Sequence, residues 1–504
     1  MNSFRVQAVV GLGLALSACP RQAHDRPAPE AIARAVDSLA TMAVREGLAP
    51  ALGVAIAMDG RVIYAKSHGM ADATAGIPAD DRTLWYLAST SKSYTGFGIA
   101  LLADRGELRI DSPITTLLPG VAWHPGARAE HLTLGHFLSH TTNLNDNAIV
   151  QSAAFTGAIP EPRWPQLISL AAPTGANDLV YSNFGYNVAA MVIDQRRPEG
   201  WKRYLEENVY RPAGLLETYA RVSGLEARIA KPHRLLADGR YVTGRFQKTD
   251  LTMNSAGGHV ATLADLARWT IVHIDSGRID GQQVFPKSAV LLSHQLIAKQ
   301  TRDQAKRFAF FDREGWGAGW DIGTYEGERM VSRFGGYNTT RSHLGFLPGR
   351  RIGVVAMSTG GLGSSLTDVV AAYAYDLEAG RPDARARAES RMTDLRQRLT
   401  QAKRNAATSD STRAARQRQT LSRPLSDYTG RFSDPSFGEV SFTLRDGKLE
   451  YTWGVLEGPA EIFDAAQQQM RIEIAGTGHP VAFTFEGSGA ATAIQLQGVT
   501  FTRR

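Results

Sequence analysis

The sequence predicts an α+β fold joined to a small all-β domain at the C-terminus. Two β-rich runs surround an Asp59-Gly60 turn in "GVAIAMDGRVIYAKSHG", which is typical of a β-hairpin. Strand patterns return in "GWGAGWDIGTYEG", "ERMVSRFGGYN" and "SHLGFLPGRRIGVVAMS", and the segments before them alternate helical patterns with loops. Strands at both ends with helices between them indicate one large domain, residues 31–380, whose sheet is built from both of its ends.

The C-terminal quarter of the chain divides into two segments of different composition. Residues 381–423 are rich in Ala, Arg and Gln with few large apolar side chains, which predicts a solvated helix followed by a flexible linker. A basic binding arm is the alternative interpretation of this segment. Residues 424–504 are β-rich, with a hairpin around Asp446-Gly447 and strand patterns in "MRIEIAG", "VAFTFEG" and "AIQLQGVTFT". They predict a separate small β domain without an obvious catalytic set.

Composition and charge are those of a large globular protein. The chain has 504 residues, of which 43% are hydrophobic and 8% aromatic, and its length suggests two or three domains. The net charge is +7, but residues 381–423 hold 12 Lys and Arg against 4 Asp and Glu. That segment contributes +8, which leaves −1 for the rest of the chain. The basic charge belongs to one segment, so no nucleic-acid partner is predicted.

The N-terminus has the pattern of a bacterial export signal. Its apolar run, residues 6–16, is too short to span a membrane as a stable helix. The following "LSAC" resembles the lipobox of bacterial lipoproteins, in which the Cys becomes the lipidated first residue. We predict a signal peptide over residues 1–18, lipidation of Cys19 and a Pro-rich tether over residues 19–30. The protein would cross the inner membrane and face the periplasm, held by the lipid alone; an ordinary signal cleaved nearby is the alternative.

The segment "LWYLASTSKSYTGFG" (residues 84–98) places a hydroxyl and an amine three positions apart. On a helix, residues i and i+3 share a face, so Ser89 and Lys92 would project into the same space. If the helix begins at Ser89, the positive end of its dipole favours an anion that develops there. Serine becomes a good nucleophile only when a neighbour takes its proton. The alternative is a serine that merely caps the helix.

A second polar group occurs in "LVYSNFGYN". In an extended segment Tyr181 and Asn183 would point the same way and present a phenol and an amide together. A phenolate beside a lysine would relay the serine proton, and the amide would hold a substrate carbonyl. The alternative is a core tyrosine followed by an asparagine in a turn.

Five segments in order, "ASTSKSYTG", "LTLGHFLSHTTNL", "YSNFGYN", "SAGGHVATLADLARW" and "RFGGYNTTRSHLGFLPGRRIGVVAMS", resemble the serine β-lactamase-related hydrolases. That group includes class C β-lactamases, DD-peptidases, D-aminopeptidases and related esterases. The resemblance covers residues 31–380 and implies a β-lactamase/transpeptidase-like antiparallel sheet flanked by helices, with a helical subdomain. It implies Ser89 as the acylated nucleophile, Lys92 as its base or proton relay and Tyr181 as the partner general base. Asn183 would position Lys92 and the substrate.

The third motif departs from the family pattern of Lys or His, any residue, then Gly. The matching residues are Arg333-Phe334-Gly335, followed by Gly336. Arg333 keeps a cation and would hold a substrate carboxylate through two hydrogen bonds, but it does not release a proton at neutral pH. By resemblance, the backbone N–H groups of Ser89 and Gly336 would form an oxyanion hole. The C-terminal β domain resembles the lipocalin-like domains often appended to these hydrolases.

Other catalytic classes are weakly supported. His136 and His140 have zinc-like spacing in "HFLSH", but the Glu of H-E-x-x-H is missing and no third ligand is evident. Cys19 is the only cysteine, which excludes a disulfide within the chain and a cysteine nucleophile in the folded part. No G-x-S-x-G and no P-loop occur. No metal and no cofactor is therefore predicted.

These observations predict a serine hydrolase that acts through an acyl-enzyme on Ser89 in the cell envelope. The substrate would be an ester, a D-amino-acid peptide or a β-lactam, with an esterase or peptidase favoured because of Arg333 and the added C-terminal domain. The alternative from another class is a non-catalytic, penicillin-binding-like scaffold protein of the envelope. The four residues Ser89, Lys92, Tyr181 and Asn183 argue against that alternative.

Overall fold

The computed structural model describes residues 26–145, 147–175, 179–301, 310–362 and 364–504. The predicted signal peptide and Cys19 lie outside these ranges. Within them, no helix combines the length and the apolar character that a membrane crossing requires.

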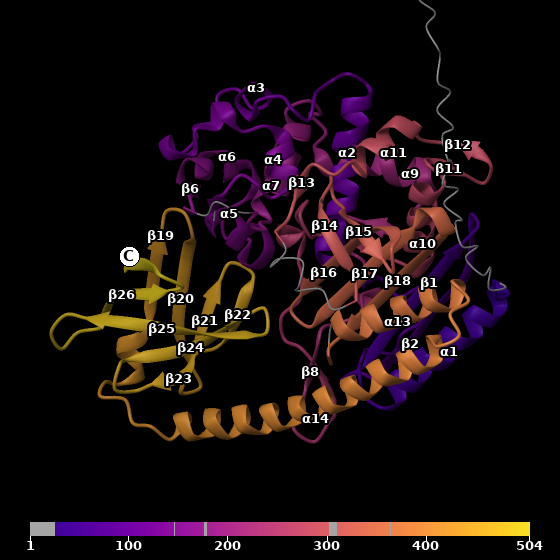
Figure 1. Cartoon of the computed structure of the whole chain (residues 1–504). Coiled ribbons are helices and arrows are strands. Elements are labelled where there is room, and N and C mark those ends of the chain that lie inside the picture. Colours follow the sequence, from indigo (N-terminus) through magenta and orange to yellow (C-terminus); the bar gives the residue numbers. More distant parts are fainter. Residues whose placement is uncertain (1–25, 146, 176–178, 302–309, 363) are drawn as a thin grey trace, which may run out of the picture.

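The larger part of the molecule is built on a nine-stranded antiparallel sheet (Figure 1). In spatial order its strands are β13 (Ala298–Lys299), β14 (Asp312–Trp316), β15 (Asp321–Tyr325), β16 (Glu328–Tyr337), β17 (Thr340–Leu347), β18 (Ile352–Thr359), β1 (Ala51–Met58), β2 (Arg61–Asp72) and β3 (Ile77–Pro78). Strand β1 pairs with β18 on one side and with β2 on the other. The sheet thus joins both ends of the large domain, as the sequence predicts.

Helices cover both faces of this sheet. On one face α1 (Pro29–Arg45), α13 (Ser364–Glu378) and the start of α14 (Ala384–Gln417) share a core with Leu52, Val54 and Ile56 of β1. On the other face α2 (Lys92–Asp104), α10 (Leu263–Ile274) and α11 (Lys287–Ser293) share a core with Ala51, Ala55 and Ala57. Because both faces of β1 are buried, it appears in the sequence as an unbroken apolar run.

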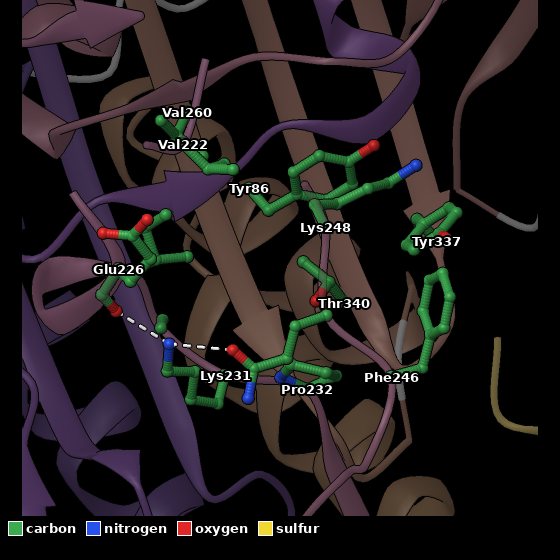
Figure 2. Close-up of a pocket in the computed structure, with 13 residues that line it drawn as sticks. Tyr86, Val222, Glu226, Lys231, Pro232, Phe246, Lys248, Val260, Tyr337 and Thr340 are labelled. Carbon is green, nitrogen blue, oxygen red and sulfur yellow. Dashed lines mark hydrogen bonds between the residues drawn. The ribbon is translucent and has the colours of Figure 1, made fainter. Parts of the chain in front are cut away.

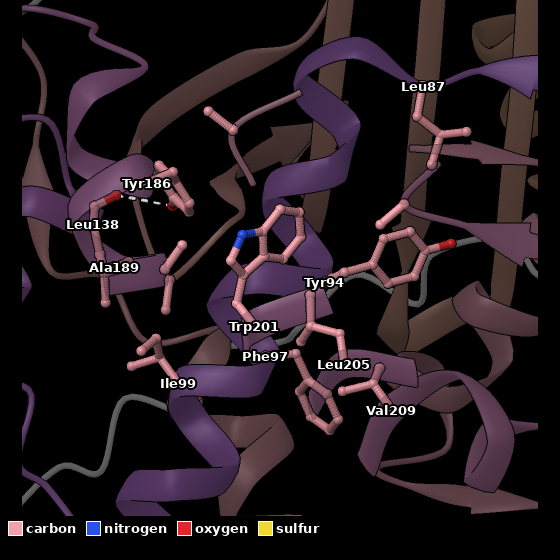
Figure 3. Packing of buried hydrophobic residues seen from close by; sticks show 14 of the residues in the cluster. Leu87, Tyr94, Phe97, Ile99, Leu138, Tyr186, Ala189, Trp201, Leu205 and Val209 are labelled. Atoms are coloured by element: carbon pink, nitrogen blue, oxygen red, sulfur yellow. Dashed lines mark hydrogen bonds between the residues drawn. The ribbon is translucent and has the colours of Figure 1, made fainter. Parts of the chain in front are cut away.

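A helical subdomain packs around α2. Its helices are α3 (Ile114–Leu117), α4 (Leu134–Leu138), α5 (Asn147–Gln151), α6 (Trp164–Leu167), α7 (Phe184–Asp194), α8 (Trp201–Leu205) and α9 (Arg211–Ala213). Figure 3 shows Tyr94 and Phe97 of α2 beside Trp201 and Leu205 of α8. Helix α2 is buried on all sides from Lys92 to Leu102, which explains its Gly/Ala-rich, apolar sequence.

Short strands complete the large domain. They form a three-stranded sheet of β4 (Trp85–Tyr86), β10 (Val260–Ala261) and β7 (Thr218–Tyr219), and the pairs β5 (Leu144–Asn145) with β6 (Ala172–Pro173), β8 (His233–Leu235) with β9 (Tyr241–Thr243), and β11 (Arg278–Ile279) with β12 (Gln282–Gln283). Strand β4 leads directly into the turn that precedes α2.

Residues 384–417 form one 34-residue helix, α14, that runs along one side of the molecule to the C-terminal domain (Figure 1). Its first half buries Ala388, Met392, Leu395 and Leu399, whose spacing places them on one face, while its second half is largely exposed. Near its end, Arg413 pairs with Glu461 of the C-terminal domain at 2.5 Å. The helix is therefore anchored to a domain at each end.

The C-terminal domain is a second nine-stranded antiparallel sheet, curled into a barrel-like shape around its own core. Its strands in spatial order are β22 (Leu456–Pro459), β21 (Lys448–Trp453), β20 (Gly438–Arg445), β19 (Gly430–Asp434), β27 (Val499–Arg503), β26 (Ala491–Leu496), β25 (Thr477–Phe485), β24 (Gln469–Ile474) and β23 (Glu461–Asp464). The predicted fold class, an α+β domain with a C-terminal all-β domain, is confirmed.

Candidate active site

Ser89 lies in a tight 3₁₀ turn, Ala88–Ser91, between β4 and α2. The α-helix begins only at Lys92, three residues later than the sequence suggests. Ala88 has a φ of 49°, which lies in the left-handed region of backbone conformations. Residues other than glycine adopt that region at a cost of about 1–2 kcal/mol. Such strain is typical of functional sites, where the surrounding structure holds an unfavourable backbone in place. The turn presents Ser89 at the edge of an otherwise buried helix.

The ammonium of Lys92 is fully buried and all three of its N–H groups are used. Nζ donates to Ser89 Oγ at 3.1 Å, to Asn183 Oδ1 at 2.7 Å and to the backbone oxygen of Ala256 at 2.7 Å. Burial, and then the positive charge of Arg333, lower the pKa of Lys92 well below its usual value of 10.5. The environment therefore lowers the cost of removing one proton from Lys92 next to the Ser89 hydroxyl.

Tyr181 closes the group from the solvent side. Its Oη lies 2.6 Å from Ser89 Oγ and accepts a hydrogen bond from Arg333 Nη2 at 2.9 Å. Its ring lies 5.1 Å from Lys92 Nζ, and the residue is 43% exposed. Asn183 stands directly before α7 with a helical backbone, so the extended geometry expected for Tyr181 and Asn183 is wrong. Both side chains nevertheless reach the Ser89–Lys92 pair.

The guanidinium of Arg333 is held by groups of the protein itself. Nε donates to the backbone oxygen of Ser89 at 3.1 Å, Nη1 to Asp321 Oδ1 at 3.0 Å and Nη2 to Tyr181. Arg333 is only 2% exposed, and its guanidinium lies 4.9 Å above the ring of Trp316. The sequence predicts a substrate carboxylate as the partner of Arg333, whereas in the structure Asp321 supplies the carboxylate. The arginine instead directs positive charge at Tyr181 Oη.

Strand β16 presents an open edge to Ser89. Its pairing with β15 ends at Ser332, and beyond that residue the described structure pairs β16 only with β17. A Cβ at Gly335 would lie 2.3 Å from Leu87 O and 3.1 Å from the backbone nitrogen of Ser89. The glycine thus allows the strand to touch the Ser89 turn. Gly336 is exposed beside it, where the sequence predicts the second donor of an oxyanion hole.

Replacement of Gly335 by alanine should lower kcat/KM for a nitrophenyl ester by a factor of about 100 or more, comparable to the loss of one oxyanion donor. The added Cβ would collide with the Leu87 carbonyl and push β16 away from Ser89. Gly349→Ala is the matched control, because a Cβ there meets nothing within 4 Å. Circular dichroism of both variants checks the fold. Wild-type activity in Gly335→Ala would contradict this geometry.

Several contributing residues were given no role by the sequence. Asp321 and Trp316 carry no recognisable motif, and only the strand register brings them to the site. The Ala256 carbonyl lies in the segment "SAGGHVATLADLARW", but its contact with Lys92 depends on the path of that loop. His140 packs its ring 4.5 Å from the rings of Tyr181 and Trp316 and forms a wall of the site. Burial lowers the pKa of His140 well below 6.5, which disfavours the charged form of its ring.

The two histidines with zinc-like spacing make different contacts. His136 Nδ1 accepts from the backbone N–H of Thr133 at 2.9 Å and caps α4, whereas His140 faces Tyr181. Among the residues that the structure describes, no group of three or more His, Cys, Asp or Glu side chains could hold a metal ion.

A small pocket, which Ser89 and Lys92 do not line, lies between Tyr86 of β4 and Tyr337 at the end of β16 (Figure 2). Its volume of about 40 Å³ holds little more than water, so it is too small for a substrate. At its rim, Lys248 Nζ lies 3.8 Å from the centre of the Tyr337 ring and donates to Thr252 O at 3.3 Å. This half-buried lysine contacts the end of the strand that carries Gly336.

The chain is similar to known proteins over most of its length. A family model described as Beta-lactamase matches residues 36–379. The chain is 24% identical over 326 residues to "Penicillin-binding protein 4" of Amycolatopsis lactamdurans, which covers 63% of this chain and 82% of that protein. It is 33% identical over 114 residues to "Esterase EstB" of Burkholderia gladioli, which covers 22% of this chain and 29% of that protein.

Among solved structures, the octameric penicillin-binding protein homologue from Pyrococcus abyssi is similar with a TM-score of 0.58. The match covers 93% of this chain and 99% of that chain at 18% identity, and thus shows a shared fold. The family model spans the sheet domain, the helical subdomain and the whole Ser89 site. The chain therefore belongs to the β-lactamase family and is a serine hydrolase of the β-lactamase-related type.

Proposed function

We propose that the protein hydrolyses its substrate through an acyl-enzyme on Ser89. The observation that carries this proposal is the position of Ser89 Oγ, which is hydrogen-bonded to Lys92 Nζ at 3.1 Å and to Tyr181 Oη at 2.6 Å. A serine bonded to two groups that can take its proton is activated for attack. A helix cap would bond to backbone N–H groups, and neither the Ala88–Ser91 turn nor α2 has a side-chain cap.

In the first half-reaction, Ser89 Oγ bonds to the substrate carbonyl carbon while its proton passes to Lys92, directly or through Tyr181. The negative oxygen of the tetrahedral intermediate is bound by the N–H groups of Ser89 and Gly336, at about 3 kcal/mol per donor. The bond to the leaving group then breaks, and the proton from the Lys92–Tyr181 pair passes to that group. In the second half-reaction, water attacks the acyl carbon while the Lys92–Tyr181 pair takes its proton. The bond between that carbon and Ser89 Oγ then breaks, Oγ regains the proton, and the acid is released.

Arg333 Nη2 donates to Tyr181 Oη at 2.9 Å, and Lys92 Nζ lies 5.1 Å from the Tyr181 ring. Asn183 Oδ1 accepts a hydrogen bond from Lys92, and in this proposal the Asn183 side chain also binds the substrate. In this proposal Arg333 is a positioning residue, which acts on the substrate through Tyr181.

We propose esters, and D-amino-acid peptides without a free carboxylate next to the scissile bond, as substrates ahead of β-lactams. β-Lactams carry a carboxylate beside the scissile amide, and a site that selects them needs a free cation there. Arg333 is buried and already bound to Asp321, Tyr181 and Ser89 O, which supports a preference for substrates without that carboxylate. Parallel assays with a nitrophenyl ester, a D-alanyl peptide amide and a chromogenic cephalosporin rank the three substrate classes. Turnover of the cephalosporin alone would refute the preference.

Labelling with a fluorophosphonate tests whether Ser89 is the nucleophile. The wild type should bind the reagent covalently, Ser89→Ala should not, and Ser91→Ala should label like the wild type. Ser91 is the matched control because it lies in the same turn but is fully buried. If folded wild-type protein takes no Ser89-dependent label, the chain is a scaffold with this fold and not an enzyme.

We further propose that the protein is exported and anchored through a lipid on Cys19 in the periplasm of a bacterium. The support is the lipobox-like "LSAC" at the end of the apolar N-terminal run. Cys19→Ser should move the protein from the membrane fraction to the soluble fraction, with Ser89-dependent labelling retained. Continued membrane association of Cys19→Ser would place the anchor elsewhere.

A further inference from the structure

A cavity of about 440 Å³ lies between the large domain and the C-terminal barrel. Its walls come from three parts of the chain: residues 242–249 and the Asn338-Thr339 turn of the large domain, Arg413 of α14, and strands β21, β22 and β24 of the barrel. Sites for small molecules commonly have volumes of about 300–1,000 Å³ and occur where domains meet. Neither Ser89 nor Lys92 lines this cavity, so it is separate from the candidate active site.

Three arginines on the wall have unused hydrogen-bond donors. Within the described ranges, the guanidinium groups of Arg234, Arg245 and Arg471 form no hydrogen bond with the rest of the chain. The acids nearest to Arg471 are Glu461 at 3.7 Å and Glu473 at 3.9 Å, too far for a hydrogen bond. Arg245 reaches from the large domain to the barrel, where a Cβ on Gly458 would lie 3.3 Å from its Nη1. These donors are placed to receive a carboxylate.

Carboxylates that can accept hydrogen bonds also line the interdomain cavity. Glu457 and Glu473 line the cavity, and in the described structure Glu457 forms no ion pair. Behind the wall, Asp410 lies 3.9 Å from Arg234, and Glu461 pairs with Arg413. Four arginines and two glutamates line the cavity, and Asp410 and Glu461, outside the lining, balance Arg234 and Arg413, so the cavity and its surroundings together carry no net charge that would favour a simple anion. A ligand with both a carboxylate and an ammonium group would satisfy both sets.

The cavity also offers apolar contact. Phe246, Tyr451, Val455 and Pro459 contribute to its lining. The turn formed by Asn338 and Thr339 joins β16 to β17, so one wall continues into the strand that carries Gly336. An occupant would thus bind between the two domains with its side chains against aromatic rings and its charged ends on Arg and Glu.

We propose that this interdomain cavity is a second binding site, which takes a zwitterionic amino acid or a short peptide with free ends. Arg245 and Arg471 would bind the carboxylate, and Glu457 would bind the ammonium. This site is independent of the chemistry at Ser89, and the two proposals fail through different measurements.

Calorimetry on the full chain tests the proposal, with alanyl-alanine in its L,L and D,D forms as the probe. The background is Ser89→Ala, which prevents turnover. We expect binding of the free dipeptide and, because charge-assisted hydrogen bonds are lost, binding weaker by about tenfold or more in Arg245→Ala/Arg471→Ala. N-acetyl-alanyl-alanine amide, which lacks both charges, should bind the background protein more weakly than the free dipeptide by a similar factor. Arg431→Ala, which breaks a surface ion pair of the barrel, is the matched control and should bind like the background.

Glu457→Gln provides a second variant should the double variant fail to fold, and thermal denaturation checks each protein. The Glu457→Gln substitution should weaken the binding of the free dipeptide and leave the binding of a des-amino analogue, propionyl-alanine, unchanged. Absence of dipeptide binding at millimolar concentration would overturn the proposal. Equal affinity in the background and in the cavity variants would also overturn it, since the dipeptide would then bind elsewhere.

Discussion

Replacement of Ser89 by alanine is expected to lower kcat by a factor of about 10⁴ or more, the range seen when the nucleophile of a serine hydrolase is removed. The Oγ that Lys92 and Tyr181 activate is lost, while the buried lysine, the aromatic wall and the strand edge remain. The turnover of a nitrophenyl ester measures the effect. Stability should change by only about 1 kcal/mol, the net value of one hydrogen bond.

Ser91→Ala separates this effect from damage to the turn. Its hydroxyl is buried two residues away in the same 3₁₀ turn, so a general disturbance of the turn would lower activity in both variants. We expect Ser91→Ala to keep its activity within about a factor of ten of the wild type, because the side chain does not reach the reacting atoms. Equal losses in the two variants would contradict the assignment of Ser89.

Replacement of Lys92 by methionine is expected to lower kcat by about 10³, within the range that general bases contribute. Methionine fills much of the same volume but takes no proton and leaves Asn183 Oδ1 and Ala256 O without their donor. Lys248→Met is the matched control. That lysine is also surrounded by aromatic rings and backbone oxygens, but lies outside the Ser89 group, and its loss should change kcat by less than about tenfold.

The pH profile gives Lys92 a second test. Because burial and Arg333 lower its pKa, the neutral amine forms at a pH well below 10.5. The kcat/KM of the wild type should therefore rise with pH and level off well below pH 10.5, and this limb should be absent from Lys92→Met. A limb that levels off only near pH 10.5 would show that the lysine is not perturbed and would contradict the proposed role.

The parts of the site that depend on local spacing were accessible from the sequence. Ser89 and Lys92 are three residues apart, and a helical turn alone brings their side chains together. Tyr181 lies 92 residues beyond Ser89, and only the order of motifs in a known family connects them. The helical backbone of Asn183 was not predicted, because the start of α7 depends on how that helix packs beneath the site.

Contacts across the sheet could not be predicted in the same way. Asp321 reaches Arg333 because β15 and β16 pair in a particular register, with Asp321 opposite Ser332. A carboxylate in "GWGAGWDIGTYEG" gives no sign of that register. The expected substrate carboxylate at Arg333 rested on the charge of the side chain, whereas the structure shows that an internal carboxylate already satisfies it.

The segment between the domains illustrates the limits of composition. Its polar sequence is typical of a solvated helix followed by a flexible connector, yet it continues as a helix to Gln417. The C-terminal half is held by contacts that no local pattern reveals, among them Arg413 with Glu461 and Gln417 Nε2 with Ile462 O at 3.0 Å. Tertiary contacts therefore override the weak local preference of this segment.

Trapping the acyl-enzyme tests the central claim most directly. The wild type is mixed with a nitrophenyl ester, quenched in acid during turnover, digested, and mapped by mass spectrometry. The proposed mechanism predicts that the acyl mass is found on the peptide that contains Ser89, and that Ser89→Ala yields no acylated peptide. An acyl group on another residue, or turnover that Ser89→Ala retains in full, would contradict it.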